Sequence, residues 1–170
     1  LNKNLQIGDY PIFVKHSDAY LLKKETLTEY FTGNHKKVKT TDYFYDSPLY
    51  PTTLTSRRES FDNSEMLVTS ITYCFQKSNQ KLREANMIGI PLETTVVKKQ
   101  NSSDPGKTIS KIYTDYPDTL PDSQTGNLLL PKSVSTLNLS TGSMEVGVTY
   151  NQYDSKGNIL QYTTKSGIST

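Results

Sequence analysis

Apolar and polar residues alternate with a period of two along several short stretches of the chain. The clearest case is 144–151, where every second position is apolar and glutamate, glycine, threonine or asparagine lies between: Met144, Val146, Val148 and Tyr150. This alternation is typical of a β-strand that packs on one face and meets water on the other. The segment 92–116 is predicted to form two strands joined by a turn. The first strand is rich in β-branched residues, and the turn at 101–107 contains Asp, Pro and Gly.

The segment 19–31, AYLLKKETLTEYF, is where a helix competes with a strand. Its Leu, Lys and Glu residues favour a helix, whereas Thr26, Thr28 and Tyr30 suit a strand better. The letters TGN at 32–34, followed by VKTTDYFYD, indicate a hairpin. We therefore predict a strand here.

An apolar residue followed by proline recurs every 40 residues, at Tyr10-Pro11, Tyr50-Pro51, Ile90-Pro91 and Leu130-Pro131. A tyrosine stands 22 residues after each of the last three prolines, at Tyr73, Tyr113 and Tyr153, whereas the first unit has Gly33 there. A fixed period is the signature of a repeat architecture. The pattern predicts one continuous β-repeat region, 1–170, with approximate units 11–50, 51–90, 91–130 and 131–170.

The predicted fold class is all-β: an antiparallel meander of repeated β-hairpins with about eight to ten strands, in an open or curled sheet. Only 34% of the 170 residues are hydrophobic, mean hydropathy is −0.60 and tryptophan is absent. An ordinary globular domain has about 45–50% apolar residues. We therefore expect a sheet that is polar on both sides, or one that a partner covers.

The stretch 150–160, YNQYDSKGNIL, has the residues of a tight hairpin. Gly157 can adopt a positive φ without steric cost, and Asp154 can accept hydrogen bonds from the backbone of the turn. Tyr150 and Tyr153 can pack their rings on the sheet while the hydroxyl groups stay wet. We therefore assign these residues, together with Asn158, a structural role.

This stretch resembles the YD repeat of bacterial Rhs-type and related teneurin-like proteins, with Tyr153, Asp154, Gly157 and Asn158 in the motif positions. Tyr45-Asp46 is similar but lacks the glycine, and the middle units are assigned by period alone. The resemblance implies a non-catalytic wall segment of a longer repeat array, which winds a β-sheet shell and often encloses a C-terminal effector domain. It also implies an extracellular or cell-surface location. A chain that opens on Leu1 rather than Met agrees with an excised piece of something longer.

Charge and rare residues argue against other classes. The 19 basic and 17 acidic residues nearly balance, and the basic pairs are scattered, so no nucleic-acid partner is expected. The lone Cys74 excludes an internal disulfide and is expected to be a buried thiol, while His16 and His35 have polar neighbours typical of surface positions. We expect no cofactor, no metal site, no catalysis and no membrane insertion.

The rival function is a carbohydrate-binding or cell-surface-binding β module. Twelve tyrosines could offer exposed rings that stack on sugars, whereas Tyr73, Tyr113 and Tyr153 could equally pack in register along the sheet. The expected partners are the remainder of a longer chain or a carried effector domain. A meander cut from an array would also leave unpaired strand edges, which predicts edge-to-edge self-association.

Overall fold

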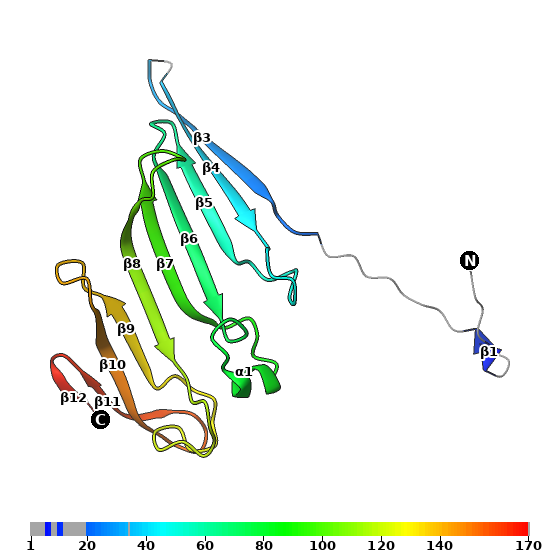
Figure 1. Cartoon of the computed structure of the whole chain (residues 1–170), viewed down its shortest axis with the longest axis vertical. Coiled ribbons are helices and arrows are strands. Elements are labelled where there is room, and N and C mark those ends of the chain that lie inside the picture. Colours follow the sequence, from blue (N-terminus) through cyan, green and yellow to red (C-terminus); the bar gives the residue numbers. More distant parts are fainter. Residues whose placement is uncertain (1–5, 8–9, 12–19, 34, 170) are drawn as a thin grey trace.

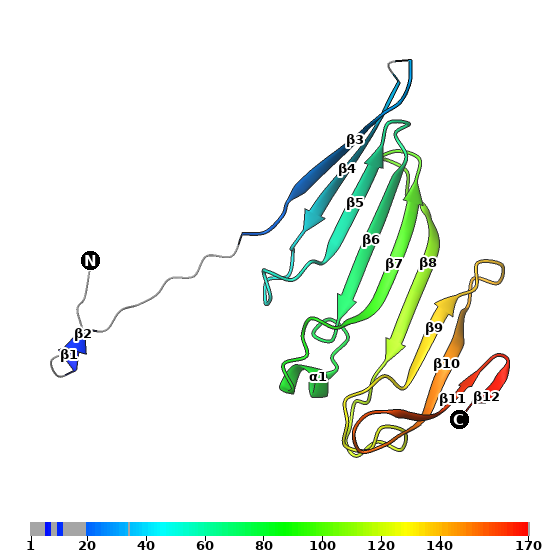
Figure 2. The same ribbon diagram turned by 180° about the vertical axis from the view of Figure 1, so that it is seen from behind.

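The computed structural model describes residues 6–7, 10–11, 20–33 and 35–169, with side chains from Tyr20 onward. Ten antiparallel strands follow one another in chain order across one open sheet (Figures 1 and 2). They are β3 (Lys24–Tyr30), β4 (Lys36–Phe44), β5 (Ser56–Phe61), β6 (Met66–Tyr73), β7 (Pro91–Lys99), β8 (Lys107–Asp115), β9 (Ser133–Leu137), β10 (Met144–Tyr153), β11 (Ile159–Thr164) and β12 (Gly167–Ser169). The predicted all-β antiparallel meander is confirmed.

The first described residues form a separate pair of two-residue strands, β1 (Gln6–Ile7) and β2 (Tyr10–Pro11). The segment in which a helix competed with a strand is the edge strand β3, so the strand prediction is confirmed.

The ends of the sheet differ in the length of chain that joins the strands. At one end lie short turns, such as 62–65 and 165–166. At the other lie the connections 45–55, 74–90 and 116–132, and the shorter turn 154–158. We call this second end of the sheet the connection end.

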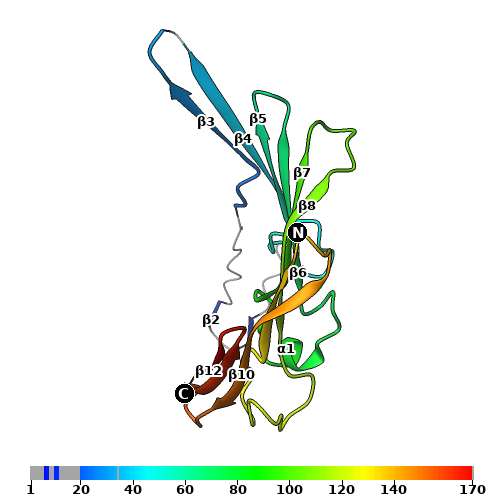
Figure 3. The same cartoon turned by 90° about the vertical axis from the view of Figure 1, so that its left-hand side faces the viewer.

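The sheet is a single layer. Figure 3 shows the strands as one twisted band with the connections 74–90 and 116–132 toward its lower end, and no described element covers either face. Neighbouring strands are therefore held on both faces by polar cross-strand pairs. On β4 and β5, Lys39 Nζ lies 3.0 Å from Glu59 Oε1 on one face, and Arg58 Nη2 lies 2.9 Å from Asp42 Oδ2 on the other. The expectation of polar residues on both sides agrees with these pairs.

The predicted packed face of 144–151 is wrong at its first residues. Met144 is 40% exposed and Val146 is 52% exposed. No second layer of the described residues lies over them, and the register shift between Val146 and Val148 leaves Gly147 unpaired with β9. Alternation correctly predicted the strand β10 but not what its apolar side chains would pack against.

Buried apolar side chains gather at the connection end. Cys74, Leu82 and Leu92 form the buried centre of this cluster, and Phe75, Met87, Ile88, Tyr116 and Leu129 pack around it. Leu92 lies at the register shift where β7 begins, and the other members lie in the connections 74–90 and 116–132. We call this group the connection cluster. Its members come from segments on both sides of β7 and β8, so it ties the connections 74–90 and 116–132 together.

The connection 74–90 contains a helix that the sequence analysis did not predict, α1 (Gln80–Glu84). Its N-cap is Asn79, whose side-chain oxygen accepts a hydrogen bond from Leu82 N at 3.0 Å. A helix of five residues is too short to be stable alone. Burial of Leu82 in the connection cluster holds it in place.

The 40-residue period coincides with one hairpin in three of the four units. Residues 11–50 contain the hairpin of β3 and β4. Residues 51–90 contain β5 and β6, and residues 91–130 contain β7 and β8. Residues 131–170 contain two hairpins, β9–β10 and β11–β12. The last unit therefore has an additional hairpin, which begins with the turn at Asp154.

Leu82→Ala tests the connection cluster. The side chain of Leu82 is fully buried, so the truncation is expected to lower the free energy of unfolding by about 2–5 kcal/mol. Urea unfolding followed by circular dichroism measures this change. Leu49→Ala, at a side chain that is 66% exposed, is the matched control and should change stability by less than about 0.5 kcal/mol. Equal losses in the two variants would contradict a core at the connection end.

Candidate functional site

The turn between β10 and β11 places the YD-type residues in one hydrogen-bonded loop. Asp154 Oδ1 accepts hydrogen bonds from Lys156 N and Asn158 N, each at 2.8 Å, and Asp154 Oδ2 accepts one from Asn158 Nδ2 at 2.8 Å. These hydrogen bonds, that from the Asn158 side chain first, hold the pKa of Asp154 below its usual range. The carboxylate is therefore used by the turn itself, as the sequence predicted.

Gly157 has the positive φ that the turn requires, +88°. A Cβ atom at this position would lie 3.3 Å from Leu130 Cδ1, in the connection before Pro131. Glycine is therefore required by backbone conformation and by the close approach of Leu130.

Two of the three periodic tyrosines fasten the second strand of a hairpin to the entry of its first strand. Tyr73 OH, at the end of β6, donates to Leu54 O at 2.7 Å. Tyr153 OH, at the end of β10, donates to Pro131 O at 2.8 Å. Burial raises the pKa of both hydroxyl groups, to about 12 for Tyr153. These hydroxyl groups are bonded to backbone within the protein rather than left wet.

Tyr113 has a different position. Thr72 pairs with Glu93, and Glu93 pairs with Tyr113, so these three side chains share one face of the sheet. Tyr73 follows Thr72 along β6 and points to the opposite face. Tyr113 OH instead donates to Asp115 Oδ1 at 3.4 Å. The periodic tyrosines therefore do not form one row on one face.

The last three of the four periodic prolines all lie at the connection end, before or at the start of a strand. Pro51 is in the turn that precedes β5, Pro91 is the first residue of β7 and Pro131 lies two residues before β9. Pro91 lies opposite Tyr73. A strand tolerates proline at its first residue because little of the hydrogen-bond ladder is lost there.

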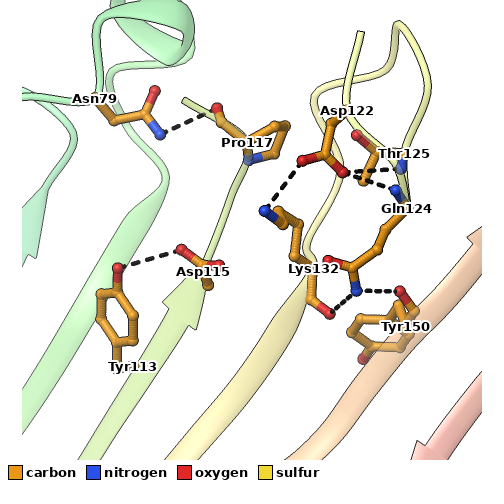
Figure 4. Close-up of polar contacts among 9 residues, drawn as sticks. All are labelled: Asn79, Tyr113, Asp115, Pro117, Asp122, Gln124, Thr125, Lys132 and Tyr150. Carbon is orange, nitrogen blue, oxygen red and sulfur yellow. Dashed lines mark hydrogen bonds and ion pairs between the residues drawn. The ribbon is translucent and has the colours of Figure 1, made fainter. Parts of the chain in front are cut away.

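The connection 116–132 is fixed by a polar network that the sequence analysis missed (Figure 4). Gln124 Nε2 donates to Tyr150 O at 2.8 Å and to Lys132 O at 3.3 Å, which joins the loop to the entry of β9 and to β10. Asp122 Oδ2 lies 3.0 Å from Lys132 Nζ. Burial would raise the pKa of Asp122, but hydrogen bonds from Gln124 N and Lys132 outweigh it, and the pKa is lowered. The only signal in the sequence is the turn composition of DSQTG at 122–126.

Asn79 links the connections 74–90 and 116–132. Its side chain is 5% exposed, and its Nδ2 donates to Pro117 O at 3.3 Å (Figure 4). The polar letters of 78–81, Ser-Asn-Gln-Lys, give no sign of this burial. A polar residue beside a helix start can be buried when it satisfies both a helix N–H group and a neighbouring carbonyl.

Titratable groups converge at a shallow hollow of about 260 Å³ on the face of Tyr113. Lys77 Nζ and Lys111 Nζ each lie 3.1 Å from a different carboxylate oxygen of Glu93. Burial would raise the pKa of Glu93, but the hydrogen bonds from Lys111 and Lys77 outweigh it, and the pKa is lowered. Glu93 is thus an ionised carboxylate that two lysines neutralise. The two ion pairs of Glu93 tie β7 to β8 and to the start of connection 74–90.

The remaining sequence candidates lie as follows. Cys74 is fully buried, as predicted, and burial raises the pKa of its thiol. His35 is exposed in the turn between β3 and β4, also as predicted, and His16 lies outside the described residues. Over the described ranges there is no group of three or more His, Cys, Asp or Glu residues that could hold a metal ion. In the same ranges, no helix has the length and apolar character needed to cross a bilayer.

Comparison with known proteins gives no relative: no family model, no curated protein and no solved structure matches the chain. The candidate residues are therefore interpreted from their own contacts. Those contacts hold turns and connections.

Gly157→Ala tests the turn. The positive φ is expected to cost about 1–2 kcal/mol of unfolding free energy, with a further loss from the contact with Leu130. Thermal or urea unfolding measures the change. Gly89→Ala is the control, because a Cβ there would meet no atom within 4 Å. A Gly157 variant as stable as the Gly89 variant would contradict the role of the turn.

Tyr153→Phe tests the hydroxyl contact and its pH dependence. Loss of the hydrogen bond to Pro131 O should cost about 1 kcal/mol near neutral pH. Because the pKa of Tyr153 rises from 10.0 to about 12 on folding, the unfolded chain loses its proton first, and wild-type stability should fall between these pH values. The variant should lose less stability over this interval.

Unfolding curves at several pH values, followed by circular dichroism, compare the wild type with Tyr153→Phe. Tyr20→Phe, at a side chain that is 94% exposed, serves as the control and should follow the wild type. Parallel alkaline losses in the wild type and in Tyr153→Phe would show that the Tyr153 hydroxyl is not responsible.

Proposed function

We propose that this chain is a non-catalytic structural repeat segment of a bacterial protein of the Rhs or YD-repeat type, secreted or displayed at the cell surface. In such a protein it forms part of a β-sheet wall. The observation that carries the proposal is a ten-stranded sheet in chain order whose end strands, β3 and β12, have no further neighbour among the described residues. A sheet of this kind can be continued at either side by more strands.

The use of the polar residues supports the same function. Asp154 and Asn158 close a turn, Gln124 and Asn79 fasten connections, and Glu93 is held by two lysines. Groups that act on a substrate must have free hydrogen-bonding or acid–base capacity directed at a pocket. In this chain that capacity is used to hold strands and loops together, which is what a wall requires.

The contacts of the tyrosines weigh against the carbohydrate-binding alternative. A sugar platform requires rings exposed side by side, yet Tyr73 and Tyr113 point to opposite faces, and Tyr73 is 5% exposed. The hydroxyl groups of Tyr73 and Tyr153 are bonded to backbone carbonyls. The remainder of a longer chain, or an effector domain that it carries, is the partner that fits the proposal.

Two measurements test this function. Sequencing of the coding region on both sides of the segment should show further hairpin repeats and a downstream effector domain. A coding region without either would contradict the wall function.

A glycan array is probed with the purified chain and with its Tyr113→Ala variant. We expect the same result for both, with no glycan bound through Tyr113. The Tyr113 ring lines the shallow hollow beside Glu93, so this variant removes the aromatic surface of that hollow. Glycan binding that depends on Tyr113 would replace the wall function with the carbohydrate-binding one.

A further inference from the structure

The outer side of β3 presents a regular row of backbone groups. Tyr43 N donates to Lys23 O, and Phe31 N donates to His35 O, so the odd-numbered residues of β3 direct their N–H and C=O groups toward β4. The even-numbered residues direct theirs away from β4. The outward groups belong to Lys24, Thr26, Thr28 and Tyr30.

This edge lacks the backbone features that usually protect a strand edge. β3 contains no proline, and its pairing with β4 runs over seven residues without a register shift. Leu22 is 52% exposed and Tyr30 is 82% exposed. Natural sheets protect exposed edges with prolines, bulges, very short strands or charged side chains. Of these, β3 has only charged side chains, at Lys24, Glu25 and Glu29. The opposite edge strand, β12, has only three residues.

A recurring charge pattern in the sheet indicates what belongs at this edge. Asp42 lies between Lys24 and Arg58, at 3.9 and 2.9 Å, and Glu93 lies between Lys77 and Lys111. Glu29, on β3, lies opposite Lys37 on its inner side and faces the open edge on the other. A basic residue from an added strand would complete the same arrangement of one acid between two bases.

We propose that β3 pairs with β3 of a second copy of this chain, antiparallel about a two-fold axis that passes beside Thr26. In this register Lys24 lies opposite Thr28 of the second copy, and Thr26 lies opposite its own counterpart. Each such pair exchanges two backbone hydrogen bonds. Lys23 then faces Glu29 of the second copy, and Leu22 faces the second copy's Tyr30.

Charge selects this register over its neighbour. A shift that brings Leu27 to the axis would place Glu25 opposite Glu29 of the second copy, at both ends of the interface. Like charges directly opposite one another destabilise a strand pair. The register beside Thr26 instead gives two opposite-charge pairs, and the same patch serves both copies. This association goes beyond the wall function, because it joins two chains, and it takes the edge that a further strand of a longer chain would otherwise occupy.

Charge reversal tests both the association and its register. The wild-type chain should form a concentration-dependent dimer in sedimentation equilibrium at low salt. Lys23→Glu alone places Glu opposite Glu, and Glu29→Lys alone places Lys opposite Lys, so each should weaken the dimer at least about tenfold. An equimolar mixture of the two variants places Glu opposite Lys at both ends and should restore dimerisation between unlike chains.

The mixture also controls for effects within one chain. Lys23 Nζ lies 5.0 Å from the Tyr45 ring, and Glu29 lies opposite Lys37, so each substitution changes a local contact as well. Local damage would persist in the mixture, whereas a lost intermolecular pair is regained. A wild-type chain that stays monomeric, or a mixture no tighter than its components, would overturn the proposal.

Thr26→Pro tests the backbone pairing. Its N–H group points away from β4, so proline should block the added strand while the β3–β4 hydrogen bonds remain. Thr26→Val keeps the N–H group and is the matched control, with circular dichroism to verify that both variants fold. The proline variant should be monomeric and the valine variant dimeric. Equal dimerisation of the two would contradict pairing through this edge.

Discussion

A sheet of one layer has to satisfy both of its faces with its own side chains, and most of this structure follows from that constraint. Among the described residues, neither face has a neighbour that could bury a wide apolar surface, and the strands carry threonine, serine and ion pairs. Asp42, Glu59 and Glu93 each lie near two basic side chains. Partly exposed ion pairs of this type contribute little individually. Their contribution here is to register, since Asp42 and Glu93 each lie between bases on two neighbouring segments.

Apolar stabilisation is concentrated where the chain leaves the sheet. The long connections fold against one another, and Leu82, Leu92 and Cys74 are excluded from water there. Asn79 and Gln124 join the same segments through hydrogen bonds to carbonyl groups. The sheet is thus fastened at one end, while the opposite end has only short turns. This difference places the residues that contribute most to stability in loops rather than in strand centres.

The sequence predicted the strands and turns well because these depend on local chemistry. Alternation identified β10, the turn residues identified the loop at Asp154, and Thr26, Thr28 and Tyr30 favoured a strand over a helix. Partners distant in sequence were not predictable in this way. The burial of Asn79 depends on Pro117, 38 residues away, and the exposure of Met144 and Val146 depends on the lack of a covering layer.

The spacing of the tyrosines shows the same limit. A period of 40 residues correctly indicated that the second strands of successive hairpins end in a similar place. It could not indicate the register shifts between Thr72 and Tyr73 or between Val96 and Val97, which are set by how neighbouring strands pair. Because side chains alternate between faces, such shifts decide on which face each residue lies.

The position of Cys74 gives this chain a built-in reporter of local opening. It is the single cysteine of the sequence and is fully enclosed where α1 meets the start of β7. A thiol reagent can reach it only when that enclosure breaks, and burial also disfavours the reactive thiolate. The labelling rate would therefore measure how often the loops detach from the sheet, without any probe being engineered into the molecule.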